Sequence, residues 1–140
     1  MSETIFSKIL TEETEASFVY RDELVSAFMD IHPVNPGHTL VIPNKPVANL
    51  QDLDNETAGR MFTVAKQIST AIRNSDISCD GINLILADGE AAGQEVFHVH
   101  LHVVPRTVGD GFGFRYTDPS FQRADRPALN QTAEQIKSVL

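Results

Sequence analysis

The chain has 140 residues, and its 11 basic and 19 acidic side chains give a net charge of −8 at pH 7. This length predicts a single domain over 1–140, because domains cluster near ~100 to 150 residues. The negative charge argues against a polymeric nucleic-acid partner, since binding a phosphate backbone needs clustered positive charge. Cys79 is the only cysteine, which excludes an intramolecular disulfide and favours a reducing, cytoplasmic location.

The two ends of the chain also carry information. Four of the first fifteen residues are glutamates, and this segment lacks the basic start and apolar run of a signal peptide. No stretch approaches the ~18 apolar residues of a membrane helix, so we expect no membrane partner. Residues 107–140 are predicted to form a looser arm. Either this arm closes over the domain or onto a second subunit, or Arg106 just before it or Arg115 within it meets a substrate anion.

The hydrophobic pattern predicts strands and helices in a mixed order. Period-2 alternation and apolar runs predict strands over 18–20, 25–29, 39–42, 81–86 and 96–104, with 81–86 buried. The first two read as a hairpin. Asp54 is a good N-cap for an amphipathic helix over about 55–74, and Asn130 can cap a last short helix.

Three of the five histidines lie in one short segment, 97–103. Side chains of a strand alternate between two faces, so His98, His100 and His102 are predicted to share one face. Phe97, Val99, Leu101 and Val103 then occupy the other face, where the 55–74 helix can cover them.

Three interpretations of this histidine row compete. In the first interpretation the histidines simply lie on a solvated sheet face, which accounts for a single histidine better than for three at alternate positions. A shared zinc ion is limited by distance, since residues four apart on a strand lie roughly 13 Å from each other, and a third ligand would have to come from His38, Glu95 or Asp88. We therefore predict no metal and no cofactor.

The third interpretation is nucleophilic catalysis at phosphorus. A neutral imidazole is abundant at pH 7, and one ring nitrogen can attack while the other donates a hydrogen bond that fixes the tautomer. Gly89 and Gly93, together with Gln94, lie just upstream, where backbone N–H groups could approach phosphate oxygens closely.

The segment HVHLHVV at 98–104 resembles the signature of the histidine triad nucleotide-binding proteins, His-x-His-x-His-x-x with hydrophobic x. The similarity continues in 91–97, 35–43 and 5–9. It implies an α+β fold: a five-stranded antiparallel sheet with one long amphipathic helix packed on one face, plus short N-terminal and C-terminal helices. It also implies a homodimer that joins two sheets, and hydrolysis or transfer at the α-phosphate of a nucleotide.

The resemblance implies roles for individual residues. His100 corresponds to the nucleophile that takes the nucleotidyl group, while His98, His102 and His38 orient it and meet the phosphate or leaving group. Asp30 occupies the position that holds the ribose hydroxyls. The remaining predicted nucleotide-binding residues are Phe6, Ile9, Phe28 and Ile31 in an apolar base pocket, and Gly93, Gln94 and Glu95 near the phosphate.

Four departures from the family pattern refine the prediction. His102, where one branch has glutamine, points to hydrolysis rather than uridylyl transfer. Ser7 replaces a zinc-binding cysteine of some relatives, Ala87 replaces an asparagine near the phosphate, and Glu95 replaces a phosphate-bonding serine. We expect a purine nucleotide phosphoramidate or similar substrate. The alternatives are a dinucleoside polyphosphate hydrolase and a nucleotide-binding interaction module with incidental turnover.

Overall fold

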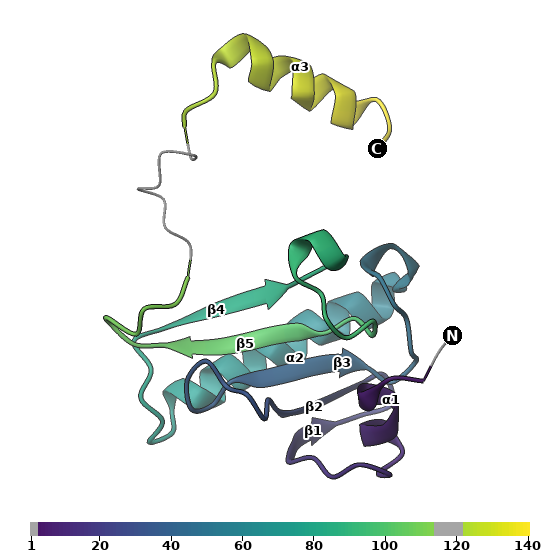
Figure 1. The fold of residues 1–140 in the computed structure, drawn as a ribbon, viewed down its shortest axis with the longest axis vertical. Coiled ribbons are helices and arrows are strands. Elements are labelled where there is room, and N and C mark those ends of the chain that lie inside the picture. The colour runs from purple at the N-terminus through teal and green to yellow at the C-terminus, as the bar shows by residue number, and fades with distance from the viewer. Residues whose placement is uncertain (1–2, 114–121) are drawn as a thin grey trace. The chain divides into compact units, whose positions relative to one another are not determined.

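The computed structural model describes residues 3–113 and 122–140 (Figure 1). The chain forms two compact units, Met1–Asp110 and Gly111–Leu140. Within the described residues, the second unit contains the helix α3 (Arg126–Lys137). The elements of the first unit are α1 (Ile5–Leu10), β1 (Phe18–Arg21), β2 (Val25–Met29), β3 (Thr39–Pro43), η1 (Leu50–Asp52), α2 (Asn55–Arg73), β4 (Gly81–Leu86), η2 (Glu90–Ala92) and β5 (Leu101–Arg106).

The five strands form one antiparallel sheet in the order β1-β2-β3-β5-β4. The first two strands are the predicted hairpin, and β3 extends one residue beyond the predicted 39–42 to include Pro43. In the central pair, Leu40 of β3 faces His102 of β5. The α+β class and the five-stranded antiparallel sheet are thus confirmed.

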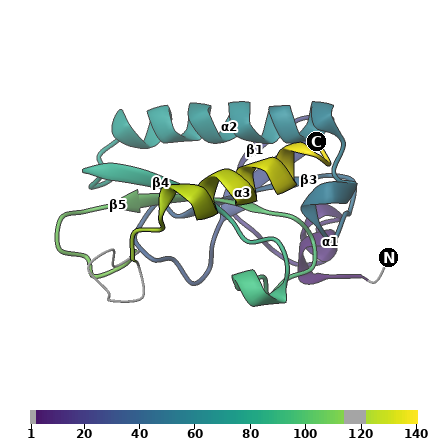
Figure 2. The same ribbon diagram turned by 90° about the horizontal axis from the view of Figure 1, so that it is seen from above.

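One face of the sheet is covered by α2, as predicted (Figure 2). The helix begins where Asp54 accepts a hydrogen bond from the Thr57 N–H, and its Met61 and Val64 are almost fully buried. They pack against a cluster of strand side chains that includes Val41 and Val103. The apolar side of β5 therefore belongs to the main core.

The opposite face of the sheet carries the short helix α1 (Figure 2). Thr4 caps this helix, and its Phe6 and Ile9 pack on Phe28 and Leu40 in a second, smaller cluster. This is also the face of His102, because Leu40 and His102 are paired neighbours on adjacent strands. The histidines consequently lie beside an apolar cluster rather than on a bare sheet surface.

The prediction of a continuous strand over 96–104 is wrong in its first half. The strand β5 begins at Leu101, and residues 96–100 are irregular. His98 and His100 therefore precede the strand that carries His102, and Phe97 is 46% exposed instead of lying in the core. Pairing with β3 starts only at Leu101, so the alternating pattern in the sequence begins several residues before the strand does.

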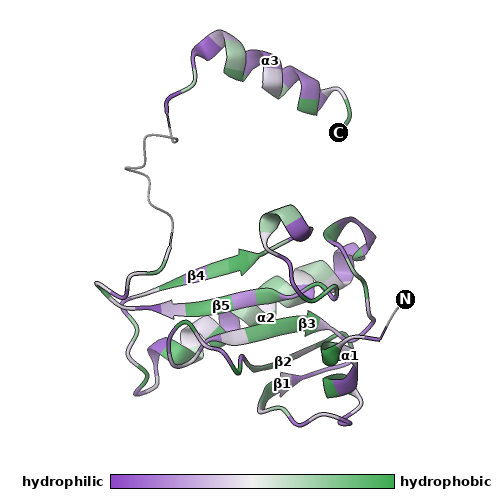
Figure 3. Ribbon diagram, in the orientation of Figure 1, coloured by the Kyte–Doolittle hydropathy of each residue, from purple (hydrophilic) through white to green (hydrophobic). Residues whose placement is uncertain are grey.

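Two further predictions need correction. β4 is half-exposed rather than buried, because it is an edge strand, although its residues are largely hydrophobic (Figure 3). The C-terminal helix α3 is capped by Asp125, whose carboxylate accepts from the Ala128 N–H, so Asn130 lies inside it. A proline in the first turn suits this earlier start.

The expected homodimer stays a prediction. No helix in the described part of the chain is long and apolar enough to cross a membrane.

Candidate active site

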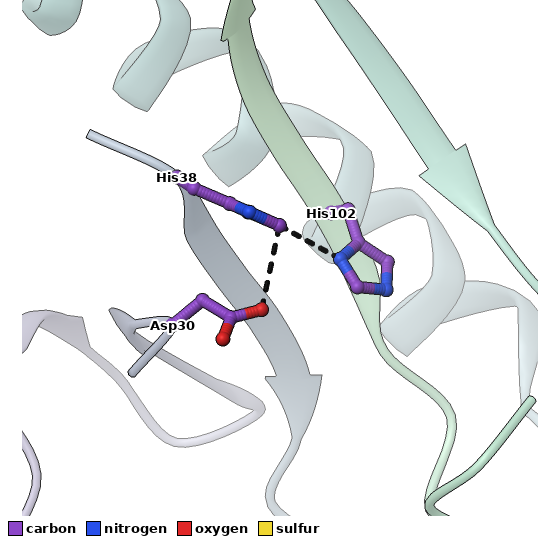
Figure 4. A group of neighbouring side chains, drawn as sticks. All are labelled: Asp30, His38 and His102. Carbon is purple, nitrogen blue, oxygen red and sulfur yellow. Dashed lines mark hydrogen bonds and ion pairs between the residues drawn. The ribbon is translucent and has the colours of Figure 1, made fainter. Parts of the chain in front are cut away.

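His38 and His102 meet although 64 residues separate them. His38 directly precedes β3 and His102 lies on β5, and the antiparallel pairing of these strands brings them side by side (Figure 4). His38 Nε2 lies 2.9 Å from His102 Nδ1. At this separation the two ring nitrogens share one hydrogen bond.

A main-chain group fixes the direction of that hydrogen bond. The Val34 N–H donates to His38 Nδ1 at 3.1 Å, so Nδ1 must be the unprotonated nitrogen of this ring. A neutral His38 then carries its hydrogen on Nε2 and donates it to His102 Nδ1. It follows that a neutral His102 carries its own hydrogen on Nε2, where it is available as a donor.

His98 and His100 are fixed by carbonyl groups instead. His98 Nε2 lies 2.8 Å from the Pro43 carbonyl, and His100 Nδ1 lies 2.8 Å from the carbonyl of His98. A carbonyl can only accept, so both of these nitrogens carry a hydrogen. The Nε2 of His100 is left with a lone pair and has no hydrogen-bond partner among the described residues.

Burial keeps the four rings neutral. Loss of hydration lowers the pKa of His38, His98 and His100 below its ordinary value. The same effect, with the neighbouring His100 and His38 as further causes, lowers the pKa of His102 to about 4. At pH 7 the cluster therefore offers one nucleophilic lone pair and one neutral N–H donor, which is a useful combination for group transfer.

Asp30 lies at the end of β2, next to this pair (Figure 4). Its Oδ2 is 3.5 Å from His38 Nε2, and its Oδ1 accepts from the His32 N–H at 2.8 Å. The carboxylate partly offsets the burial of His38 by favouring its charged form. The predicted contact of Asp30 with ribose stays a prediction.

The residues predicted for the base pocket do not all gather in one place. Phe6, Ile9 and Phe28 are buried together, and the Phe6 ring lies edge-on to Phe28 at 5.5 Å and to His100 at 5.0 Å between centroids. Ile31, in contrast, is 83% exposed. Of the three buried residues Phe6 contacts the histidine rings, whereas Ile31 offers an exposed apolar side chain next to Asp30.

The segment predicted to meet phosphate is an ordered turn after β4. Gly89 and Gly93 have φ angles of +96° and +93°, which favour glycine. The side chain of Gln94 is buried and fully used, because it accepts from the Gly89 N–H and donates to the carbonyls of Ala48 and Val96. It shapes the turn, while Glu95 is exposed.

A metal ion has one candidate position in the described part of the chain. Asp30, His38 and His102 each offer a ligand atom, and these atoms lie within 4.8 Å of one another (Figure 4). Carboxylate and imidazole donors suit zinc. Two of these atoms, His38 Nε2 and His102 Nδ1, are already hydrogen-bonded to each other. The absence of a metal stays our prediction.

Several residues that shape the site carried no signal in our reading of the sequence. Val34 and Pro43 act through main-chain groups, and Asn35 anchors the turn before His38. Asn35 and Pro43 stand at the two ends of the 35–43 segment of the family resemblance, and Val34 precedes it. Arg106, which we predicted to contact a substrate anion, forms an ion pair with Asp110 of the same chain. Arg115, the other predicted residue, lies outside the described residues.

Comparison with known proteins gives consistent results. A family model described as HIT domain matches residues 11–109. The purine nucleoside phosphoramidase of Escherichia coli K12 is 43% identical over 105 residues, which span 73% of this chain and 86% of that protein. An uncharacterized HIT-like protein of Borreliella burgdorferi is 47% identical over 116 residues, or 82% and 84% of the two chains.

Solved structures agree with this match. A crystal structure of a HIT family member from Bacillus subtilis superposes with a TM-score of 0.88 at 36% identity, covering 99% of this chain and 98% of that one. A zinc-bound histidine triad family protein from Mycobacterium smegmatis gives a TM-score of 0.74 at 38% identity, covering 97% and 96%.

Proposed function

This chain belongs to the histidine triad (HIT) family, and on that premise we propose that it is a nucleotide hydrolase that uses His100 as its nucleophile. The family match and the E. coli relative support hydrolysis of a nucleotide derivative. The observation that carries the assignment of His100 is its main-chain hydrogen bond: Nδ1 donates to the His98 carbonyl, and Nε2 keeps its lone pair.

The proposed reaction has two balanced steps. His100 Nε2 attacks the α-phosphorus, a P–N bond forms, and the bond to the leaving group breaks. The leaving group takes that electron pair together with the proton from His102 Nε2, and the negative charge left on the His102 ring is balanced by the positive charge of the His100 ring, which now carries phosphorus on Nε2 and hydrogen on Nδ1. Water then attacks the phosphorus of the nucleotidyl-histidine and returns the electron pair to His100, and its proton passes to His102 Nε2.

The substrate in this proposal is a purine nucleoside 5′-phosphate joined to an amine. The name of the E. coli relative supports this choice. Asp30 would hold the ribose hydroxyls, because a carboxylate offers two acceptor oxygens to two adjacent O–H donors. Ile31, with its exposed apolar side chain beside Asp30, would contact the base. In the turn after β4, the N–H groups of Gly93 and Gln94 already donate to the Glu90 and Gly89 carbonyls, so the Glu95 N–H is the group that would meet the phosphate.

Rapid quenching of the reaction with adenosine 5′-phosphoramidate tests the proposal. Intact-protein mass spectrometry should reveal a transient gain of one adenylyl group, and His100→Ala should never acquire it. A chain that binds the nucleotide but never becomes adenylylated would instead be a binding module. Diadenosine polyphosphates assayed side by side separate the two hydrolase alternatives, since the preferred substrate has the higher kcat/KM.

A further inference from the structure

We propose that Asn35 is a positioning residue that anchors the 32–38 turn to the end of β5 and so keeps the hydrogen of His102 on Nε2, facing the leaving group. This inference deepens the proposed function and rests on it, because it explains what prepares His102 as the acid. Among the described residues Asn35 has no hydrogen bond to a histidine ring, so we assign its effect to the turn that contains it.

Asn35 makes three hydrogen bonds: one joins the turn to β5, one joins it to Asp110 just beyond β5, and one closes the turn itself. Its Nδ2 donates to the Pro105 carbonyl at 2.9 Å and to Asp110 Oδ2 at 2.8 Å. Its own carbonyl accepts from the His38 N–H at 3.1 Å. Asp110 is in turn held by the Arg106 guanidinium, so the anchor is itself fixed. The amide of one side chain thus connects the end of β5 to the residue that contacts His102.

The turn fits so closely against β5 that its position is sensitive to this anchor. Gly37 adopts a φ of +96°, and a Cβ at this position would lie 3.1 Å from the ring of Pro105 and 3.2 Å from Ile77. A side chain at this position would therefore push the turn away from β5. The hydrogen bonds of Asn35 hold the turn in this close position.

The position of the turn decides where two hydrogens reside. With Val34 N–H on His38 Nδ1, the chain of hydrogen bonds runs from Val34 through His38 to His102. If the turn moves away, His38 Nδ1 can take the hydrogen and Nε2 becomes an acceptor. His102 then donates from Nδ1, and its Nε2 holds a lone pair that cannot protonate a leaving group. Within the His38–His102 pair itself, the two arrangements differ only in which nitrogens carry the hydrogens.

Imidazole tautomers can be read directly by ¹⁵N-edited NMR of the histidine side chains at pH 7. In the native protein we expect both His38 and His102 as the Nε2–H tautomer. Asn35→Ala and Asp110→Ala should each introduce the Nδ1–H tautomer at His102. Asp110→Asn should retain the native pattern, since its amide oxygen can still accept from Asn35. Asn83→Ala is the matched control, because it removes an Arg106 contact at the same corner but none to the turn.

Kinetics provide a second readout. A well-placed general acid matters most for a poor leaving group, so Asn35→Ala should lower kcat for an alkyl phosphoramidate of AMP about 10- to 100-fold. For a p-nitrophenyl ester of AMP, whose leaving group needs no proton, kcat should fall less than about threefold. KM should change little for both substrates. Asn83→Ala should leave the ratio of the two kcat values unchanged.

Two results would overturn the inference. One is an unchanged His102 tautomer in Asn35→Ala; the other is an equal loss of kcat for good and poor leaving groups, which a general structural role would produce. Failure of the proposed function looks different, since it would show as normal turnover by His100→Ala. A folded Asn35→Ala protein, verified by its thermal transition, is the condition for both readouts, and Asp110→Ala substitutes for it if the first variant does not fold.

Discussion

The two histidine pairs of the site contain the same side chain, but the main chain fixes the positions of its hydrogens in opposite ways. His98 and His100 donate to main-chain carbonyls, whereas His38 accepts from a main-chain N–H and passes its hydrogen bond on to His102. A carbonyl forces the hydrogen onto the nitrogen that it binds, and an N–H forces a lone pair there. The main chain therefore leaves a lone pair on His100 Nε2 and a hydrogen on His102 Nε2, the two groups that the proposed mechanism uses as nucleophile and acid.

The pairs also differ in their surroundings. His98 is fully buried, and its Nδ1 is a buried atom without a hydrogen-bond partner in the described structure. The His98 ring lies edge-on to the Phe6 ring, with 5.9 Å between the two centroids. The other pair lies next to the carboxylate of Asp30. The side of the site with His98 and His100 is thus apolar, while the side with His38 and His102 is polar, and each can be disturbed separately.

Removing the nucleophile should have the largest effect. His100→Ala should lower kcat by at least about 10⁴-fold, because no other ring nitrogen can replace the lone pair aimed at the phosphorus. Nucleotide affinity, measured by calorimetry, should stay within about threefold. His32→Ala is the matched control, since His32 is exposed and contacts Asp30 only through its N–H. Near-normal turnover by His100→Ala would refute the mechanism.

Removing the acid should have a smaller effect that depends on the leaving group. His102→Ala should lower kcat about 10²- to 10³-fold for an alkyl phosphoramidate and much less for a p-nitrophenyl ester. The nucleotidyl-enzyme should still form, and stopped-flow measurement of nitrophenolate release would show it as a burst. If both substrates lost kcat equally, His102 would not be the acid, and the distinction between the pairs would fail.

The sequence predicted the scaffold better than the fine structure of the site. Periodicity and the Asp54 cap placed α2 within one residue of its observed ends, because that helix buries one regular face. Alternation could not show that β5 starts at Leu101. Before that residue, Val99 still points into the core, but its N–H pairs with the isolated carbonyl of Val47 rather than with a ladder partner.

The groups that fix the tautomers left no trace in the pattern for a physical reason. A main-chain carbonyl or N–H is present at nearly every residue, so nothing in the sequence marks Pro43 or Val34 as partners of histidines. The sequence could show that the histidines cluster. Only the fold could show which ring nitrogen each of them leaves free.

Low pH should weaken the fold through these same rings. Burial lowers the pKa of His102 to about 4, whereas the unfolded chain protonates near the ordinary value of ~6.5. The unfolded state therefore binds more protons between these values, and stability falls as pH falls from about 6.5 to about 4. We expect His102 to account for about 2 kcal/mol of that loss, after allowance for partial exposure.

Urea unfolding of the native protein and His102→Gln over this pH range measures that contribution. The variant should show a shallower loss of unfolding free energy below pH 6.5, although its stability at pH 7 is itself altered. Parallel pH profiles would mean that His102 does not stay neutral through burial. Asp22→Asn is a useful contrast, because hydrogen bonds from Tyr20, Leu24, Val25 and Arg60 outweigh burial and hold the pKa of this carboxyl well below its usual range. Its loss should therefore leave the slope of stability between pH 6.5 and 4 nearly unchanged.

The smallest expected effect concerns Glu95, which lies outside both pairs in the turn that we propose meets the phosphate. A carboxylate facing a bound phosphate would be repelled by it, and the exposed side chain of Glu95 suits a role in which only its N–H contributes. A serine there could add one neutral hydrogen bond of ~0.5 to 1.5 kcal/mol, so Glu95→Ser should raise kcat/KM for a small amine leaving group by no more than about tenfold. Glu90→Ser, a substitution of another exposed glutamate in the same turn, should change it little and serves as the control. If Glu95→Ser or Glu95→Ala instead abolished turnover, the carboxylate would be the proton donor, and the N–H that the backbone prepares on His102 would not be the one that the leaving group receives.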